Sequence, residues 1–129
     1  MHLTSHRFDE PECLALIRHC TLVVAIHGCD GRDQKVLLGG RDLALKQRIA
    51  VALAAESLVA SGDGHRFPAL REDNVCNRGA RGQGVQLEIT HPLRRSMQAV
   101  RLAIAVRSAL HEAAAVHTRG RRRVARSGA

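Results

Sequence analysis

The sequence predicts an α/β fold, a mixed and partly parallel sheet flanked by helices. The stretch "TLVVAIHG" over 21–28 is a continuous apolar run rich in β-branched residues, typical of a central strand buried on both faces of a parallel sheet. Residues 85–90 alternate between apolar and polar, which predicts a second strand. Segments with the apolar spacing of helices, over 42–60 and from 93 onward, alternate with these strands.

The first third of the chain predicts a helix, the first long strand and a short strand. "DEPECLALIRHC" begins with Asp9 as a possible N-cap and places Arg18 and His19 in its last turn, which suits the helix dipole. After the strand at 21–28 and a polar loop, "KVLLGG" over 35–40 predicts a short strand that ends in two glycines.

The middle of the chain predicts a helix, a long loop and the second strand. Leu45, Ile49 and Leu53 recur at helical spacing, so Asp42 to about Ala60 should be a helix. "SGDGHRFPALREDN" and the Arg-, Gly- and Asn-rich segment after it predict an exposed loop that leads into the strand at 85–90.

The last third predicts one long helix from Leu93 and a basic tail. We expect one apolar face built from Met97, Val100 and Ile104 and widened by Leu102, Val106 and Leu110. The arginine-rich end, 118–129, is predicted to be a disordered tail, and residues 1–117 to be a single domain.

Composition limits the possible partners and surroundings of the protein. Of the 20 basic residues 18 are arginine, and the net charge of +8 predicts attraction to polyanions such as nucleic acid, anionic lipid or an acidic polymer. Phe8 and Phe67 are the only aromatic residues, so base stacking on aromatic rings is not indicated. The sequence has no signal peptide, no membrane-spanning stretch and no C-x-x-C pair, which predicts a cytoplasmic protein with free thiols.

The candidate chemistry lies where the two main strands end. If these strands are neighbours and run parallel, His27 and Glu88 point into one cleft at the carboxyl end of the sheet. A histidine there can bind zinc, and a glutamate can take a proton from a metal-bound water. The preceding loop offers Asn77, Arg78 and Arg81 to hold a substrate carboxylate.

Each of these residues also has a simpler interpretation. His27 can be a hydrogen-bonded histidine at a strand end, without a metal. Glu88 can be a solvated carboxylate, or an ion-pair partner for Arg81 or Arg94.

The chain resembles the poly-gamma-glutamate hydrolase family, also labelled phage-related replication protein, in "VVAIHG", "VLLGGRD" and "NVCNRGARGQGVQLEIT" followed by "PLRR". The family is similar to a minimal zinc carboxypeptidase. The resemblance runs from the N-terminus to about Arg95, and it implies a zinc carboxypeptidase-like fold. It implies further that His27 is the third zinc ligand, that Glu88 is the catalytic glutamate, and that Asn77 and Arg78 lie on the substrate side.

One part of the family pattern is missing. Members of the family carry a His-Gly-Gly-x-Ile-Glu type motif that supplies the first two zinc ligands, and this sequence contains no such motif. His2 and His6 lie upstream, but their spacing does not match it. A catalytic zinc site usually needs three protein ligands. We therefore expect an N-terminally truncated form that binds zinc weakly or not at all as written.

Two functions follow from these observations. The first is a zinc-dependent amidase of the carboxypeptidase type that hydrolyses γ-linked polyglutamate, an anionic polymer that suits the basic charge, or a truncated, inactive derivative of it. It is an enzyme if the missing metal ligands are supplied. The alternative is a non-enzymatic, phage replication-associated protein that binds nucleic acid through its basic tail and long arginine-bearing helix.

Overall fold

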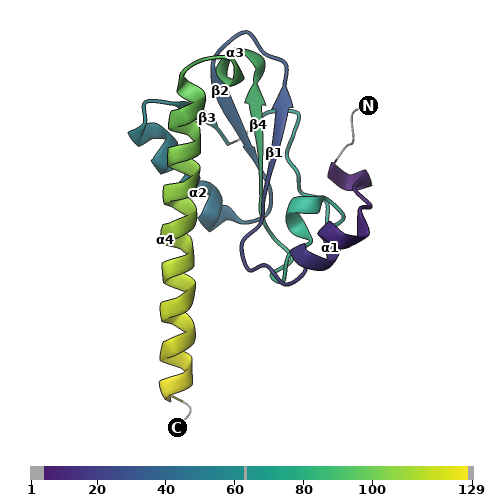
Figure 1. Cartoon of the computed structure of the whole chain (residues 1–129), viewed down its shortest axis with the longest axis vertical. Helices are drawn as coiled ribbons and strands as arrows, with labels where there is room; N and C mark the ends of the chain where they lie inside the picture. The colour runs from purple at the N-terminus through teal and green to yellow at the C-terminus, as the bar shows by residue number, and fades with distance from the viewer. Residues whose placement is uncertain (1–4, 63, 128–129) are drawn as a thin grey trace.

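A computed structural model describes the backbone of residues 5–62 and 64–127, and the side chains of these residues as far as Gly120. Its centre is a four-stranded sheet in the order β1-β4-β2-β3 (Figure 1). The strands are β1 (Val24–Cys29), β2 (Lys35–Gly39), β3 (Val59–Ser61) and β4 (Val85–Thr90). Strand β4 runs parallel to β1 and antiparallel to β2, and β2 runs parallel to β3, so the sheet is mixed as predicted.

The helices divide between the two sides of the sheet (Figure 1). They are η1 (Ser5–Arg7), α1 (Pro11–Ile17), α2 (Leu43–Ala55), η2 (Val75–Asn77), α3 (His91–Arg94) and α4 (Gln98–Ser127). Helices α2 and α4 pack against each other and cover one face, whereas α1, η1 and η2 lie on the other side. In the described part of the chain, no helix is both long and apolar enough to cross a membrane.

The apolar core lies between the sheet and helices α2 and α4. Alternate residues of the central strands point into it, and each helix contributes residues at helical spacing. The buried members include Val36, Leu38, Leu45, Ile49, Leu53, Val85, Leu87, Ile89, Leu93, Leu102, Ala105, Val106 and Ala109. The predicted helical positions of α2, Leu45, Ile49 and Leu53, are therefore confirmed as core positions.

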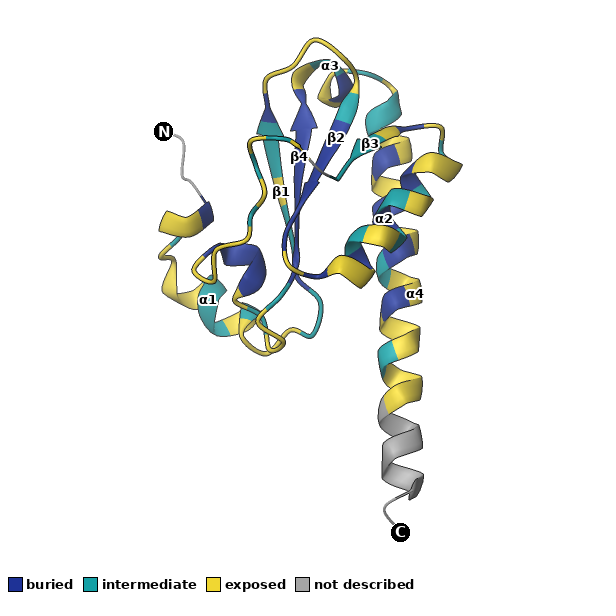
Figure 2. Cartoon of the chain, turned by 180° about the vertical axis from the view of Figure 1, so that it is seen from behind, coloured by how far each residue is buried: buried dark blue, intermediate teal, exposed yellow. Residues whose placement is uncertain are grey.

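The pairing of the two main strands is as predicted, but their places in the sheet are not. Strands β1 and β4 are neighbours and run parallel, with Val24 opposite Val85 and His27 opposite Glu88. The prediction that the first strand is central and buried on both faces is wrong, because β1 lies at the edge of the sheet and Ile26 is 62% exposed. Strand β4, in which all six residues are buried, is a central strand (Figure 2).

Helix α2 begins as predicted and ends earlier. Its N-cap is Asp42, whose side chain accepts a hydrogen bond of 3.0 Å from the Leu45 N–H. The helix ends at Ala55 instead of near Ala60, because Ser57 adopts a left-handed conformation with φ 58° that turns the chain into β3. Helix α1 is also shorter than expected and has Glu10, not Asp9, as its N-cap.

Helix α4 buries only one side of the apolar face that was expected. Leu102 and Val106 are buried as predicted, whereas Met97, Val100 and Ile104 are 88%, 61% and 51% exposed. Ala105, Ala109 and Ala113 complete the buried stripe, because their small side chains allow α4 to approach α2 closely. The predicted single helix from Leu93 is interrupted, since α3 ends at Arg94 and α4 begins at Gln98. Helix α4 continues to Ser127 and includes most of the segment predicted to be a disordered tail.

Candidate functional site

His27 and Glu88 lie in one row across the sheet face opposite α2 and α4. They are register partners on β1 and β4, and Leu37 of β2 is the partner of Glu88 on its other side. Register partners in a sheet project to the same face. Both side chains line a cavity of about 360 Å³, so the predicted meeting of His27 and Glu88 in one cleft is confirmed.

Glu88 is a buried carboxylate, not a solvated strand-end charge. It is 5% exposed, and its Oε1 accepts a hydrogen bond of 2.8 Å from Gln86 Nε2. Burial raises the pKa of the nearby Cys29 thiol, and the negative charge of Glu88 raises it further. A carboxylate held in a cavity by a donor side chain is suited to act as a base.

His27 faces the cavity from the edge strand and is partly buried. Its Nε2 lies 2.7 Å from the Ser5 hydroxyl, in a hydrogen bond whose direction depends on the ring tautomer. Ser5 and His6 belong to η1 and also line the cavity. The N-terminal segment therefore closes the cavity next to His27.

A loop that the sequence did not single out forms another wall of the cavity. A Cβ on Gly39 would meet the carbonyl oxygen of Phe67, so the glycine at the end of β2 allows this loop to cross the sheet closely. The Gly40 N–H donates to Pro68 O at 2.9 Å, and His65 Nε2 lies 3.1 Å from Leu38 O. These contacts fix residues 64–71 beside the row of His27 and Glu88.

The same loop brings two arginines to the cavity, Arg66 and Arg71. Arg71 forms a bidentate ion pair with Asp73, at 2.8 and 2.6 Å, and this hydrogen bonding lowers the pKa of the Asp73 carboxyl. The Arg66 guanidinium lies over the Phe67 ring, 4.8 Å from its centroid. In the sequence, the pair Gly39 and Gly40 indicated only that another segment can pass close to the end of β2. It did not indicate that this segment is the loop of residues 64–71.

The loop residues predicted to hold substrate lie in other surroundings. The side chain of Asn77 is buried and donates to Ala69 O and Arg71 O at 2.8 and 2.9 Å, while it accepts from the Gly84 N–H at 3.1 Å. Its amide thus ties three parts of the loop together. Asn77 is not among the residues that line the cavity of His27 and Glu88, whereas Ala69 and Arg71, which it holds, are.

The two predicted substrate arginines also have protein partners. Arg78 is exposed and donates to Phe8 O at 3.2 Å, which connects η2 to the N-terminal segment. Arg81 forms an ion pair of 2.8 Å with the buried carboxylate of Asp42, the N-cap of α2. Arg81 is therefore paired with Asp42.

The cavity offers few ligands for a zinc ion. His6, His27 and Glu88 line it, and His2 lies outside the described residues. Within residues 5–62 and 64–127 no three histidine, cysteine or carboxylate side chains come together as a metal site. A catalytic zinc usually takes three protein ligands. The described residues by themselves do not fit such an ion.

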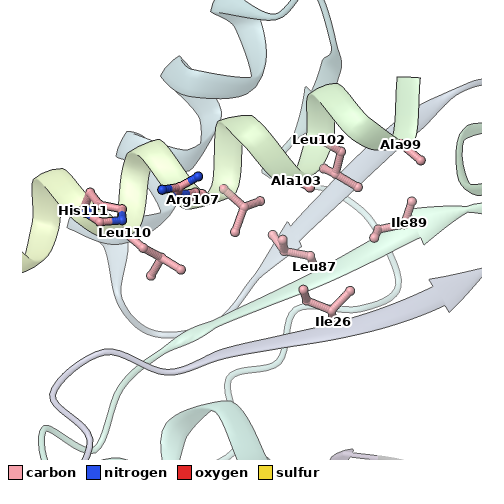
Figure 3. Close-up of a pocket in the computed structure, with 10 residues that line it drawn as sticks. Ile26, Leu87, Ile89, Ala99, Leu102, Ala103, Arg107, Leu110 and His111 are labelled. Atoms are coloured by element: carbon pink, nitrogen blue, oxygen red, sulfur yellow. The ribbon is translucent and has the colours of Figure 1, made fainter. Parts of the chain in front are cut away.

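A second hollow, of about 410 Å³, lies on the opposite face of the sheet. It is lined by apolar residues of β1 and β4, including the exposed Ile26, and by one side of α4 (Figure 3). Arg107 and His111 supply its polar groups. It contains no carboxylate and is separated by the sheet from the cavity of Glu88, so the candidate chemistry belongs to the first cavity.

Comparison with known proteins identifies the family. A sequence model of the family described as poly-gamma-glutamate hydrolase matches residues 1–122. The chain belongs to this family. It is 32% identical over 99 residues to the SPbeta prophage-derived UPF0714 protein YoqZ of Bacillus subtilis, covering 75% of this chain and 36% of YoqZ. It is 35% identical over 98 residues to the UPF0714 protein YmaC of the same organism, covering 73% of this chain and 41% of YmaC.

Solved structures with the same fold are also known. A structure of a bacteriophage poly-gamma-glutamate hydrolase superposes with a TM-score of 0.84 at 30% identity, over 89% of this chain and 64% of that one. A zinc-free apo structure of YndL superposes with a TM-score of 0.78 at 20% identity, over 87% and 64%. The α/β fold is thus that of the hydrolase, and this chain spans less than half the length of its curated relatives.

Proposed function

We propose that this protein hydrolyses the γ-amide bonds of poly-γ-glutamate, with Glu88 as the general base. The observation that carries the proposal is the row of His27 and Glu88, register partners that line one cavity. Membership in the poly-gamma-glutamate hydrolase family supports the same reaction.

Glu88 has the surroundings that proton transfer needs. Its carboxylate is buried and fixed by the donor Gln86, so it can take a proton from an attacking water without first moving. The water oxygen forms a bond to the amide carbon, the C–N bond breaks, and Glu88 returns the proton to the leaving nitrogen. General base catalysis of this kind contributes a factor on the order of 10² to 10⁴.

In this proposal His27 is the one zinc ligand taken from the described residues. His27 would be one ligand, and the other ligands would come from outside the described residues, because those residues do not complete a site. If zinc were held there, it would supply a Lewis acid. Ser5, in contact with His27 Nε2, would orient the ring and select its tautomer.

Substrate recognition falls to Arg66 in this proposal. Each residue of γ-linked polyglutamate carries a free α-carboxylate, and a guanidinium can form a bidentate pair with it. Arg66 lies on the wall of the cavity. Asn77, Arg78 and Arg81, the residues that the sequence suggested for this role, hold the loop and its neighbours in place instead.

The test is hydrolysis of defined polymers by the purified chain in zinc-containing buffer. We expect cleavage of γ-linked but not α-linked polyglutamate, measured as new amino groups. Glu88→Gln keeps the shape of the side chain but cannot take a proton, and should lower kcat by a factor on the order of 100 or more. Glu72→Gln removes an exposed carboxylate paired with Arg41 and is the matched control. Equal activity in Glu88→Gln and in the control would refute the assignment.

A second candidate function, binding of nucleic acid, is favoured by the geometry of α4. This helix continues well past the sheet to Ser127, and its sequence includes all five arginines of residues 119–129 (Figure 1). A segment with this density of positive charge attracts a polyanion. Binding to a fluorescent DNA duplex that weakens steeply with salt, and that is lost when residues 119–129 are deleted, would support this function.

A further inference from the structure

A chain of three hydrogen bonds runs through the buried wall of the cavity and ends at Glu88. The Cys76 backbone N–H donates to Asn74 Oδ1 at 3.1 Å, and Asn74 Nδ2 donates to Gln86 Oε1 at 3.0 Å. Gln86 Nε2 then donates to Glu88 Oε1 at 2.8 Å. Asn74, Gln86 and Glu88 are each at most 6% exposed, so water competes little for these bonds.

The direction of this chain follows from the chemistry of its two ends. A backbone N–H can only donate, so the Asn74 oxygen must face Cys76 and the Asn74 nitrogen must face Gln86. At the other end a carboxylate only accepts, so the Gln86 nitrogen must face Glu88. Turning the Gln86 amide by half a turn would place two donors together at Asn74 and two oxygens together at Glu88. The amide orientations are thus fixed by their partners.

We propose that Asn74 and Gln86 are positioning residues for Glu88. They hold its side chain in one orientation beside His27 and supply a donor that matches a carboxylate oxygen. The Cys76 backbone N–H in η2 sets these orientations, because it fixes the Asn74 side chain, which in turn fixes the Gln86 side chain. The role of Glu88 as a base rests on the proposed function, whereas the direction of the hydrogen-bonded chain does not.

Asn74→Asp tests the direction with almost no change in shape. A carboxylate at position 74 can still accept the Cys76 N–H, but it has no hydrogen to give to Gln86. The Gln86 amide then lies between two carboxylates, and its Nε2 donates to position 74 in part of the molecules and to Glu88 in the rest. The variant therefore removes the donor that holds Gln86 in one orientation, while the bond that caps η2 is kept.

The first readout is the scalar coupling across each hydrogen bond, measured by NMR on the isotope-labelled full chain. In the unaltered protein we expect coupling between Gln86 Nε2 and the carboxyl carbon of Glu88. In Asn74→Asp this coupling should weaken, and one to the carboxyl carbon at position 74 should appear beside it, because two carboxylates then compete for one donor. Gln83→Glu adds the same charge to the same loop and should keep the original pattern. Absence of the Gln86–Glu88 coupling in the unaltered chain, or an unweakened coupling in Asn74→Asp, overturns the proposal.

The second readout is the kinetics of γ-polyglutamate hydrolysis. A misplaced base lowers kcat by a factor on the order of 10 or more with little change in KM. We expect this in Asn74→Asp and also in Gln86→Met, which removes the donor and serves if the first variant does not fold. Unchanged kcat in Gln86→Met overturns the positioning role. If the unaltered chain shows no hydrolysis, the proposed function fails, while the couplings still decide the direction of the chain.

Discussion

Glu88 shows how neighbours turn an ordinary strand residue into a chemical group. A carboxylate is rarely buried in a central strand unless it is paired or hydrogen-bonded. Here it lies between His27 and Leu37 in the row across the sheet, and Gln86, two residues earlier on the same face, donates to it. Burial of a charge costs free energy, and selection keeps such a group chiefly where it does chemistry.

At the same scale, Arg66 and Arg78 should differ in their effect on hydrolysis. Arg66→Ala removes the guanidinium from the cavity wall and should raise KM by a factor on the order of 10, with a smaller effect on kcat, because a substrate carboxylate loses its partner. Arg78→Ala removes only an exposed contact to Phe8 O and should leave KM within about twofold. Steady-state kinetics on γ-polyglutamate compare the two. The reverse order would return the recognition role to the loop before β4.

Single residues of the loop before β4 hold neighbouring elements together. Asn77 belongs to η2, yet its amide bonds to residues before it and after it, and it keeps the long loop folded against the start of β4. The "CNRG" segment therefore has a structural role in this protein.

The free energy of unfolding should separate Asn77 from its neighbour in sequence. Asn77→Ala removes a buried amide and leaves the buried Gly84 N–H and the part-buried carbonyl groups of Ala69 and Arg71 without it. A buried group without a partner costs about 1–3 kcal/mol, so the variant should lower the free energy of unfolding by at least about 2 kcal/mol. Arg78→Ala should lower it by no more than about 0.5 kcal/mol, because the side chain is exposed. Urea unfolding followed by circular dichroism measures both. Equal losses would mean that the amide of Asn77 does not hold the loop.

Helix α4 offers a second matched pair, two valines on different faces. Val106 is 8% exposed in the core and Val100 is 61% exposed. Val106→Ala should cost roughly 1.5–3 kcal/mol, since it removes two buried methyl groups and leaves a cavity, whereas Val100→Ala should cost about 0.5 kcal/mol or less. Urea unfolding of both variants measures the two losses of stability. A larger loss in Val100→Ala would mean that the stripe of Met97, Val100 and Ile104 packs against the core in solution.

Much of this fold could be predicted from periodicity, and the errors have physical causes. Strand β4 and the core positions of α2 follow directly from their patterns. The buried face of α4 does not, because alanine is both a small core residue and a common surface residue, so the pattern gave Met97 and Ile104 more weight than Ala105 and Ala109. The apolar run of β1 indicated a strand but not its place in the sheet, which depends on long-range pairing.

The candidate site was predictable only in part for the same reason. His27 and Glu88 could be placed together because each lies near the carboxyl end of its strand, and strand order and direction bring them into register. Arg66 and Asn74 could not, because they reach the cavity through a loop whose path depends on close contact at Gly39 and on side-chain hydrogen bonds. Asn77 and Arg81 look like surface groups in sequence, but each satisfies a buried partner.

At the scale of the whole molecule, the two proposed functions would use opposite sides of one sheet. The cavity with His27 and Glu88 lies on one side, and the arginine-rich helix α4 lies on the other and extends beyond it (Figures 1 and 2). A polyanion is attracted to a chain of net charge +8 as a whole, so affinity alone does not distinguish the two sides. The two sides are distinguished by the residues that the bound polymer contacts.

The most direct measurement is therefore a chemical-shift titration of the ¹⁵N-labelled full chain with a short γ-linked glutamate oligomer. It requires neither turnover nor metal. We expect saturable shifts at the residues around the cavity, chiefly His27, Arg66, Phe67, Gln86 and Glu88, that persist at 150 mM salt because the oligomer carboxylates are bound by specific groups. Shifts confined to the end of α4, lost at the same salt and absent from Gln86 and Glu88, would contradict it.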